Sequence, residues 1–198
     1  MYENGYPLLT NDVQYLGSAL PKWKASAGTE FSYKRFRLNV LFDSQFGAKA
    51  YSMTNAVLAE GGKTKITLPG RYNGIIGEGV IRNSDGTFRP NDVVAENLPN
   101  YYTAHYGRDN VEGNLFSTDF IKLREMRLDY SLPPALLSKL HLTQASIGLY
   151  GRDMFILTNW PAFDPEFGTL NDGTIDLGFE LGQFPSTRTM GINLTVGI

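Results

Sequence analysis

The sequence predicts an all-β fold of long antiparallel strands, each with one polar and one apolar face. The clearest strand lies in residues 118–133, where the charged residues Glu125, Arg127 and Asp129 alternate with apolar ones. A period of two is typical of a strand whose two faces meet different surroundings. The alternation recurs in four other stretches. The five predicted strands lie near residues 22–33, 35–46, 118–131, 142–157 and 186–198.

The length of these strands and the order of their connections predict a membrane barrel. A usual strand has about 5–6 residues, and these are roughly twice as long, which suits a strand that crosses a bilayer at a tilt. The connections are short near residue 34 and at 132–141, and long at 47–117 and 158–185. Transmembrane barrels have short periplasmic turns and longer extracellular loops. Both long loops are therefore expected outside.

The long connection 47–117 shows no sustained period and is rich in turn signals. Connections in compact domains have a median of about 4–6 residues, so a stretch of this length is expected to hold small elements of its own. One short helix is predicted at residues 91–97, with Asn91 as its cap. A single helical turn is predicted at residues 135–140, directly after two prolines.

The bulk composition excludes several classes of protein. The chain has 198 residues, a net charge of −2, no cysteine and two distant histidines. This charge gives no case for nucleic acid, and the lack of cysteine excludes disulfides and thiolate metal sites. No apolar run reaches about 18 residues, so no transmembrane helix is expected. The first residues lack the features of a signal peptide. A barrel protein would need one upstream, so the chain is expected to be a fragment.

Residues 120–133 read FIKLREMRLDYSLP, and residues 150–166 read YGRDMFILTNWPAFDPE. These two stretches resemble the C-terminal part of the SusC/RagA family of TonB-dependent outer-membrane transporters. Shorter stretches support them: LPKW at 20–23, SYKRFRL at 32–38, and STRTMGINLTVGI at 186–198. The similar stretches are spread over nearly the whole chain. Their order along the chain is more specific than any one of them.

The resemblance implies a 22-stranded plugged barrel in the Gram-negative outer membrane. This chain would supply its last five or so strands, and the plug domain would lie upstream. Such transporters import nutrients, with glycans and oligosaccharides as the leading expectation and peptides as the second. The implied partners are a SusD-like surface lipoprotein, the TonB system through the missing N-terminal part, and outer-membrane lipid. The resemblance implies no enzymatic activity, no cofactor and no nucleic-acid partner.

Two aromatic clusters are the candidates for contact with cargo or partner. Tyr101, Tyr102 and Tyr106 lie in the first long loop, and Trp160 and Phe163 lie in the second. Exposed rings stack on sugars and on peptide side chains. The alternative is that the rings pack the loops together or against the lipoprotein, and this alternative is preferred because a long ordered loop needs its own core.

Charged residues suggest two further sites, each with a simpler explanation. Asp164, Glu166 and Asp172 are weak calcium candidates, because calcium takes oxygen ligands. Their spacing does not match an EF-hand, so solvated turn carboxylates are the default and no metal is expected. The charges at 124–129 could line a substrate path. A network of pairs across neighbouring strands is the commoner arrangement.

Two other classes of protein stay open at this point. A soluble β-sandwich that binds carbohydrate would share the alternation, although its strands should be shorter. A β-rich glycan hydrolase would need two placed carboxylates, and Asp164 with Glu166 is the only pair that suggests one. Tyr33, Tyr130 and Trp23 are expected to be girdle residues at the lipid interface if the barrel prediction is correct.

Overall fold

The computed structural model describes residues 1–171 and 174–198, which form two compact units. One unit consists of Met1–Leu20, Lys49–Ser117 and Glu166–Phe184. The other consists of Pro21–Ala48, Thr118–Pro165 and Pro185–Ile198. The second unit contains the long strands, and is called the sheet unit below. The first contains most of both long connections, and is called the loop unit.

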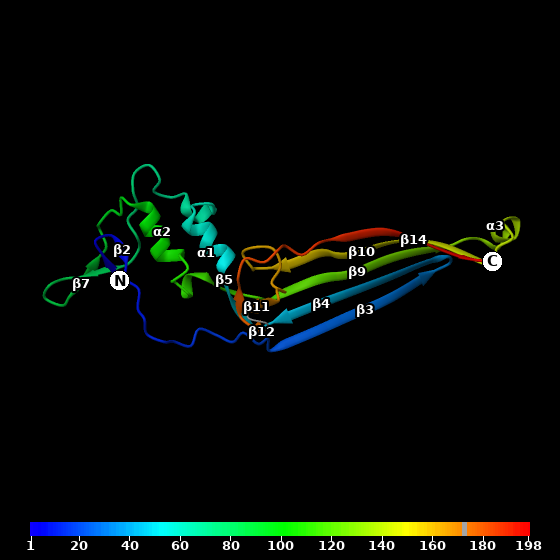
Figure 1. Cartoon of the computed structure of the whole chain (residues 1–198), viewed down its shortest axis with the longest axis horizontal. Helices are drawn as coiled ribbons and strands as arrows, with labels where there is room; N and C mark the ends of the chain where they lie inside the picture. Colours follow the sequence, from blue (N-terminus) through cyan, green and yellow to red (C-terminus); the bar gives the residue numbers. More distant parts are fainter. Residues whose placement is uncertain (172–173) are drawn as a thin grey trace. The chain divides into compact units, whose positions relative to one another are not determined.

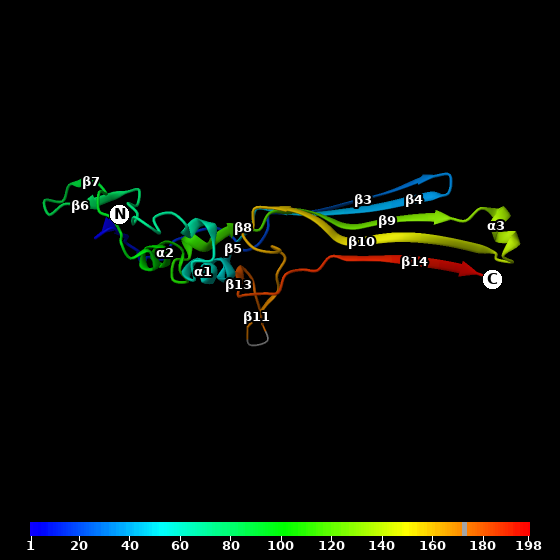
Figure 2. The same ribbon diagram turned by 90° about the horizontal axis from the view of Figure 1, so that it is seen from above.

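The sheet unit is one five-stranded antiparallel sheet. Its strands are β3 (Trp23–Tyr33), β4 (Phe36–Phe46), β9 (Phe120–Ser131), β10 (Gln144–Thr158) and β14 (Thr189–Gly197). They lie in the order β14-β10-β9-β4-β3, so each strand pairs with the long strand before it in the chain (Figure 2). The all-β antiparallel prediction is confirmed in this general form. Within the described residues the sheet is open, and β3 and β14 are its two edges.

The connections at one end of the sheet are short, as the sequence predicts. β3 and β4 are joined by residues 34–35, and Lys34 adopts a positive φ of 54° in this turn. Residues 132–143 join β9 to β10 and contain the helix α3 (Pro134–Lys139) (Figure 1). This helix is the helical turn predicted at 135–140. Pro134 occupies its first turn, where the missing N–H costs nothing.

The loop unit contains short elements where the sequence shows no period. Its strands form a four-stranded sheet (β2-β1-β6-β7), a three-stranded sheet (β13-β5-β8) and a two-stranded sheet (β11-β12). Their bounds are β1 (Tyr2–Glu3), β2 (Tyr6–Pro7), β5 (Lys49–Ser52), β6 (Val80–Arg82), β7 (Phe88–Pro90), β8 (Leu115–Ser117), β11 (Thr169–Asn171), β12 (Thr174–Asp176) and β13 (Phe179–Glu180). The helical segments are α1 (Met53–Glu60), α2 (Leu98–Tyr106), η1 (Lys65–Thr67) and η2 (Glu112–Asn114).

The helix predicted at residues 91–97 is wrong in position. The helix α2 begins at Leu98, and the Asn97 side chain caps it by accepting a hydrogen bond from the Asn100 N–H. Pro99 lies in its first turn, which favours a helix start at this point. Asn91 is instead buried, and its side-chain amide donates to the Gly77 carbonyl at 2.8 Å. Asn91 and Asn97 are both suitable N-cap residues, and Pro99 favours Asn97 because proline is accepted in the first turn of a helix.

The core of the loop unit is built from aromatic rings. Tyr2, Ala95, Tyr101 and Tyr102 form its buried cluster. The Tyr101 ring packs 4.5 Å from the His105 ring, and the Tyr2 hydroxyl lies 3.1 Å from His105 Nε2. Burial lowers the pKa of His105, because the charged imidazolium loses solvation there. The unit therefore has the small internal core that a long ordered connection requires.

Glu180 ties the two long connections together inside this unit. Its buried carboxylate accepts hydrogen bonds from the Ser52 hydroxyl at 2.8 Å and from the Thr54 hydroxyl at 2.7 Å. It also accepts from the backbone N–H of Thr54, at the start of α1, and from those of Gly182 and Gln183. A carboxylate is favoured at a helix N-terminus because the orphan N–H groups and the helix dipole meet it there.

These contacts fix the charge state of Glu180. Burial would raise its pKa, but the hydrogen bonds from Thr54, Ser52 and the Gln183 backbone outweigh burial and hold the pKa below its ordinary value of 4.5. Because the pKa is lowered on folding, the stabilisation is complete above the ordinary value. It is lost as the pH falls through the lowered pKa.

We expect Glu180→Gln to weaken the attachment of residues 176–184 by about 2 kcal/mol, because a charged acceptor of several hydrogen bonds is replaced by a neutral one. Hydrogen exchange of this segment in the whole protein measures the change. In the parent the protection should be level from about pH 7 to about pH 5 and fall only in acid. Glu78→Gln, at an exposed position of the same unit, is the control. Equal exchange in both variants would contradict the assigned role.

Candidate functional site

The register of the long sheet gathers apolar side chains on one face. Phe31, Leu38, Leu128, Leu149 and Ile192 lie side by side in one row across the five strands. The next row consists of Tyr33, Phe36, Tyr130, Ile147 and Leu194. Leu149 and Ile192 are 57% and 70% exposed, although apolar rows of this extent are normally covered in a water-soluble protein. A soluble sandwich would bury this face beneath a second sheet.

The opposite face carries charged side chains that pair with one another. Arg152 on β10 lies 3.5 Å from Glu125 on β9, and Arg37 on β4 lies 3.5 Å from Glu30 on β3. Within β9, the Arg127 guanidinium donates to the Asp129 carboxylate at 2.8 Å. Glu125 therefore pairs across neighbouring strands as predicted, whereas Arg127 and Asp129 pair with each other within β9.

Two glycines on the polar face provide space for neighbouring side chains. Gly148 lies opposite Asp129, and a Cβ at Gly148 would collide with Asp129 Oδ1. Gly191 lies opposite Tyr150, and a Cβ there would lie 2.5 Å from the tyrosine ring. The Asp129 carboxylate and the Tyr150 ring therefore lie against the backbone of the neighbouring strand.

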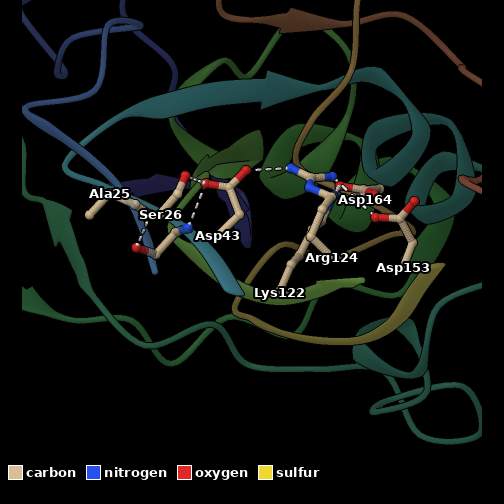
Figure 3. Close-up of polar contacts among 8 residues, drawn as sticks. Ala25, Ser26, Asp43, Lys122, Arg124, Asp153 and Asp164 are labelled. Carbon is tan, nitrogen blue, oxygen red and sulfur yellow. Dashed lines mark hydrogen bonds and ion pairs between the residues drawn. The ribbon is translucent and has the colours of Figure 1, made fainter. Parts of the chain in front are cut away.

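A pair of bulges at one level of the sheet positions Arg124. It is the extra residue of β9, because Leu41 pairs with Glu125 and Phe42 pairs with Leu123. On β10, Asp153 and Met154 lie between the residues that pair with Glu125 and Leu123, and Asp153 has a φ of +50°. Bulges re-aim side chains. Arg124 here donates to Asp43 at 2.7 Å and to Asp153 at 3.1 Å (Figure 3).

A buried ion pair anchors the segment that follows β10. Lys122 is 2% exposed, and its Nζ lies 2.6 Å from Asp164 Oδ2 (Figure 3). Nearer to β10, the Thr158 hydroxyl donates to the Asp119 carbonyl at 2.7 Å and accepts from the Trp160 N–H at 3.1 Å. These contacts hold residues 159–165 at both ends.

The predicted aromatic contacts differ in their accessibility. Tyr101 and Tyr102 are buried in the loop-unit core, and burial raises the pKa of both hydroxyls. Trp160 is also buried, whereas Tyr106 is partly buried and Phe163 is 57% exposed. The burial of Tyr101, Tyr102 and Trp160 favours the packing interpretation for these three rings. Phe163 presents the most accessible ring of the five.

The calcium candidates do not form a common site in the described part of the chain. Asp164 pairs with Lys122, and Asp172 lies outside the described residues. Among residues 1–171 and 174–198, no group of three or more histidine, aspartate or glutamate side chains is placed to hold a metal ion. No helix in the same residues is both long and apolar enough to cross a membrane.

Sequence reasoning missed Glu180 and the partner of Lys122. The hydroxyl groups that hold Glu180 belong to residues 126 and 128 positions away, and Asp164 is 42 positions from Lys122. No local pattern carries such information. One signal was available for Lys122, because it lies between Ile121 and Leu123 in a stretch of alternating polarity that changes phase at Arg124.

Comparisons of sequence and structure with known proteins agree with the resemblance to outer-membrane transporters. No protein-family model matches the chain. Three TonB-dependent receptors of Formosa agariphila are similar in sequence: P3 is 22% identical over 191 residues, P39 is 26% identical over 196, and P26 is 26% identical over 201. These alignments cover 93, 94 and 98% of this chain, but 17, 17 and 19% of the receptors. The chain thus spans less than a fifth of the length of these relatives.

Solved structures show the same fold. The RagAB peptide importer in its closed-closed state matches with a TM-score of 0.65 at 18% identity, over 96% of this chain and 19% of that chain. Its open-open state matches with a TM-score of 0.62 at 17% identity, over 98% of this chain and 20% of that chain.

The fold and its two unlike faces define a segment that resembles the wall of an outer-membrane transport barrel. More particularly, the chain is similar to part of TonB-dependent receptors, which agrees with the resemblance to the SusC/RagA family in sequence. The proteins that it resembles are receptors and importers, which is consistent with the expectation that it is not an enzyme.

We expect Asp164→Asn to loosen residues 159–165 by about 3 kcal/mol, because it removes a carboxylate that holds a buried ammonium group. Hydrogen exchange of this segment in the whole protein gives the free energy of local opening. Glu30→Gln breaks the exposed pair with Arg37 and should cost less than about 1 kcal/mol. The double variant Lys122→Met with Asp164→Leu should recover much of the loss. No difference between Asp164→Asn and Glu30→Gln would contradict the anchoring role.

Proposed function

We propose that the chain forms the last five or so strands of a 22-stranded transmembrane barrel in the outer membrane. The whole protein would then be a TonB-dependent importer of nutrients. One observation carries this proposal: the apolar face of the long sheet is exposed along rows that cross all five strands. Hydrocarbon is the surrounding that such a face fits, because a barrel wall alternates apolar and polar residues between lipid and lumen.

The two edges of the sheet support its place in a larger barrel. β3 and β14 each have one side that pairs with no other long strand in the described residues. An exposed strand edge is a template for further pairing, and a barrel satisfies it with adjacent strands. Under this proposal the charged face points into the barrel. The pairs between Arg152 and Glu125 and between Arg124 and Asp43 would line its wall.

The cargo and the partners are part of the same proposal. Oligosaccharides are the leading cargo, as the resemblance to the SusC side of the family implies. Peptides are the second candidate, because the similar RagAB structures are described as those of a peptide importer. A SusD-like lipoprotein would cover the extracellular end, where the long connections of the loop unit would lie. The TonB system would act through the part of the protein that precedes this chain.

We expect Ile192→Arg to lower the amount of folded transporter in the outer membrane, with a cost of about 2–4 kcal/mol near the bilayer centre. The matched control is Asn193→Arg, since the neighbouring residue on β14 faces the opposite side of the sheet. It should leave the amount nearly unchanged. Heat-modifiable mobility on gels of outer-membrane fractions measures the folded amount. Equal loss in both variants, or none in either, would overturn the assignment of the two faces.

The transport activity has its own test. Deletion of the gene should abolish growth on one class of nutrient at limiting concentration, and the whole gene should restore it. Growth on defined oligosaccharides and on a peptide digest, each as sole carbon source, distinguishes the two cargo classes. Unchanged growth on every substrate would contradict an importing role.

A further inference from the structure

Phe163 combines an exposed ring with an unusual backbone conformation. Its φ is +61°, a value that bulky residues rarely adopt, and its side chain is 57% exposed. Such a conformation persists only where the surrounding structure imposes it, and it is enriched at functional sites. Neither burial of the ring nor an easy turn therefore explains a phenylalanine at this position.

The surrounding structure does impose this conformation. Trp160 is buried three residues before Phe163, and Pro165 is buried two residues after it. Asp164, the next residue, is fixed by the ion pair with buried Lys122. The segment is thus held on both sides of Phe163. The fixed segment presents the ring to solvent, and little conformational freedom is left to lose when a ligand binds.

The Phe163 ring lines a cavity of about 390 Å³ in the sheet unit. Its polar lining includes Lys122, Asp164, Asp153, Ser186 and Arg188. The volume lies within the range of small-molecule sites, about 300–1,000 Å³. Among the lining residues, two cationic side chains balance two acidic ones. The lining therefore has no formal net charge that would select an ionic ligand.

We propose that Phe163 and this cavity form a subsite for one neutral sugar ring of the imported oligosaccharide. This inference rests on the proposed importing function and adds a position to it. The apolar C–H face of a sugar would stack on the phenylalanine ring. Carboxylate oxygens of Asp153 and Asp164 can accept hydrogen bonds from sugar hydroxyls, and Ser186 and Arg188 can donate them. A ring with balanced donors and acceptors suits a neutral polyhydroxyl ligand better than a charged peptide end.

Binding to the purified whole transporter tests the subsite. The probes are neutral hexasaccharides of glucose and of xylose with defined linkages, and a tryptic digest of casein, measured by calorimetry. Phe163→Leu should weaken binding of the preferred hexasaccharide by about tenfold, because it removes the stacking face. Phe163→Tyr keeps the ring and should stay within about twofold. Phe88→Leu is the matched control, since Phe88 is also 57% exposed but lies outside the cavity lining.

A further variant guards against misfolding. Phe163→Gly removes the ring and also suits the positive φ, because glycine accepts this conformation without strain. It should fold well and show the same loss of binding as Phe163→Leu.

Each outcome bears on one of the two proposals. Wild-type affinity for the hexasaccharide in both ring-less variants would overturn the subsite and leave the importing function intact. A loss confined to casein peptides would overturn the assignment to sugar. Failure of the wild-type transporter to bind or to support growth on any probe would instead count against the importing function.

Discussion

The strict separation of two faces across five strands is the constraint on which the rest of the structure depends. Because side chains alternate with a period of two, a slip of one residue between strands would exchange apolar and polar faces. The bulge at Arg124 shows how this is avoided. Ile121 and Leu123 lie on the apolar face before it, and Met126 and Leu128 lie on the same face after it. One extra residue therefore corrects the phase of β9 and also places a guanidinium on the polar side.

The long strands could be predicted because their information is local. Alternation gives each strand, two prolines follow β9, and the lengths of the connections separate the short turns from the long loops. The consecutive pair Arg124 and Glu125 interrupts the alternation, and it can now be understood as the sequence signal of a bulge. The sequence could not show that β10 has its own bulge, at Asp153 and Met154, beside the bulge of β9, because the alignment of the two bulges depends on the register between the strands.

The loop unit was not predictable in the same way. Its helices are short, with eight residues in α1 and nine in α2, too few for a clear helical period. Its stability comes instead from contacts between distant residues, such as Tyr2 with His105 and Glu180 with Thr54. The tyrosines of α2 illustrate the ambiguity. Their sequence fits both a binding surface and a core, and only their burial favours the core.

The space beside Gly148 and Gly191 would affect the width of the passage that the proposed barrel encloses. The Asp129 carboxylate and the Tyr150 ring occupy the space that a Cβ at Gly148 or Gly191 would fill. These side chains therefore lie flat along the sheet and do not project into the interior of the proposed barrel. The free diameter of the proposed barrel at these two positions would then be set by side chains that lie flat on the backbone. Alanine in place of either glycine would push the neighbouring Asp129 or Tyr150 side chain toward the interior of the barrel. The added methyl group would thereby narrow the passage for a bulky solute.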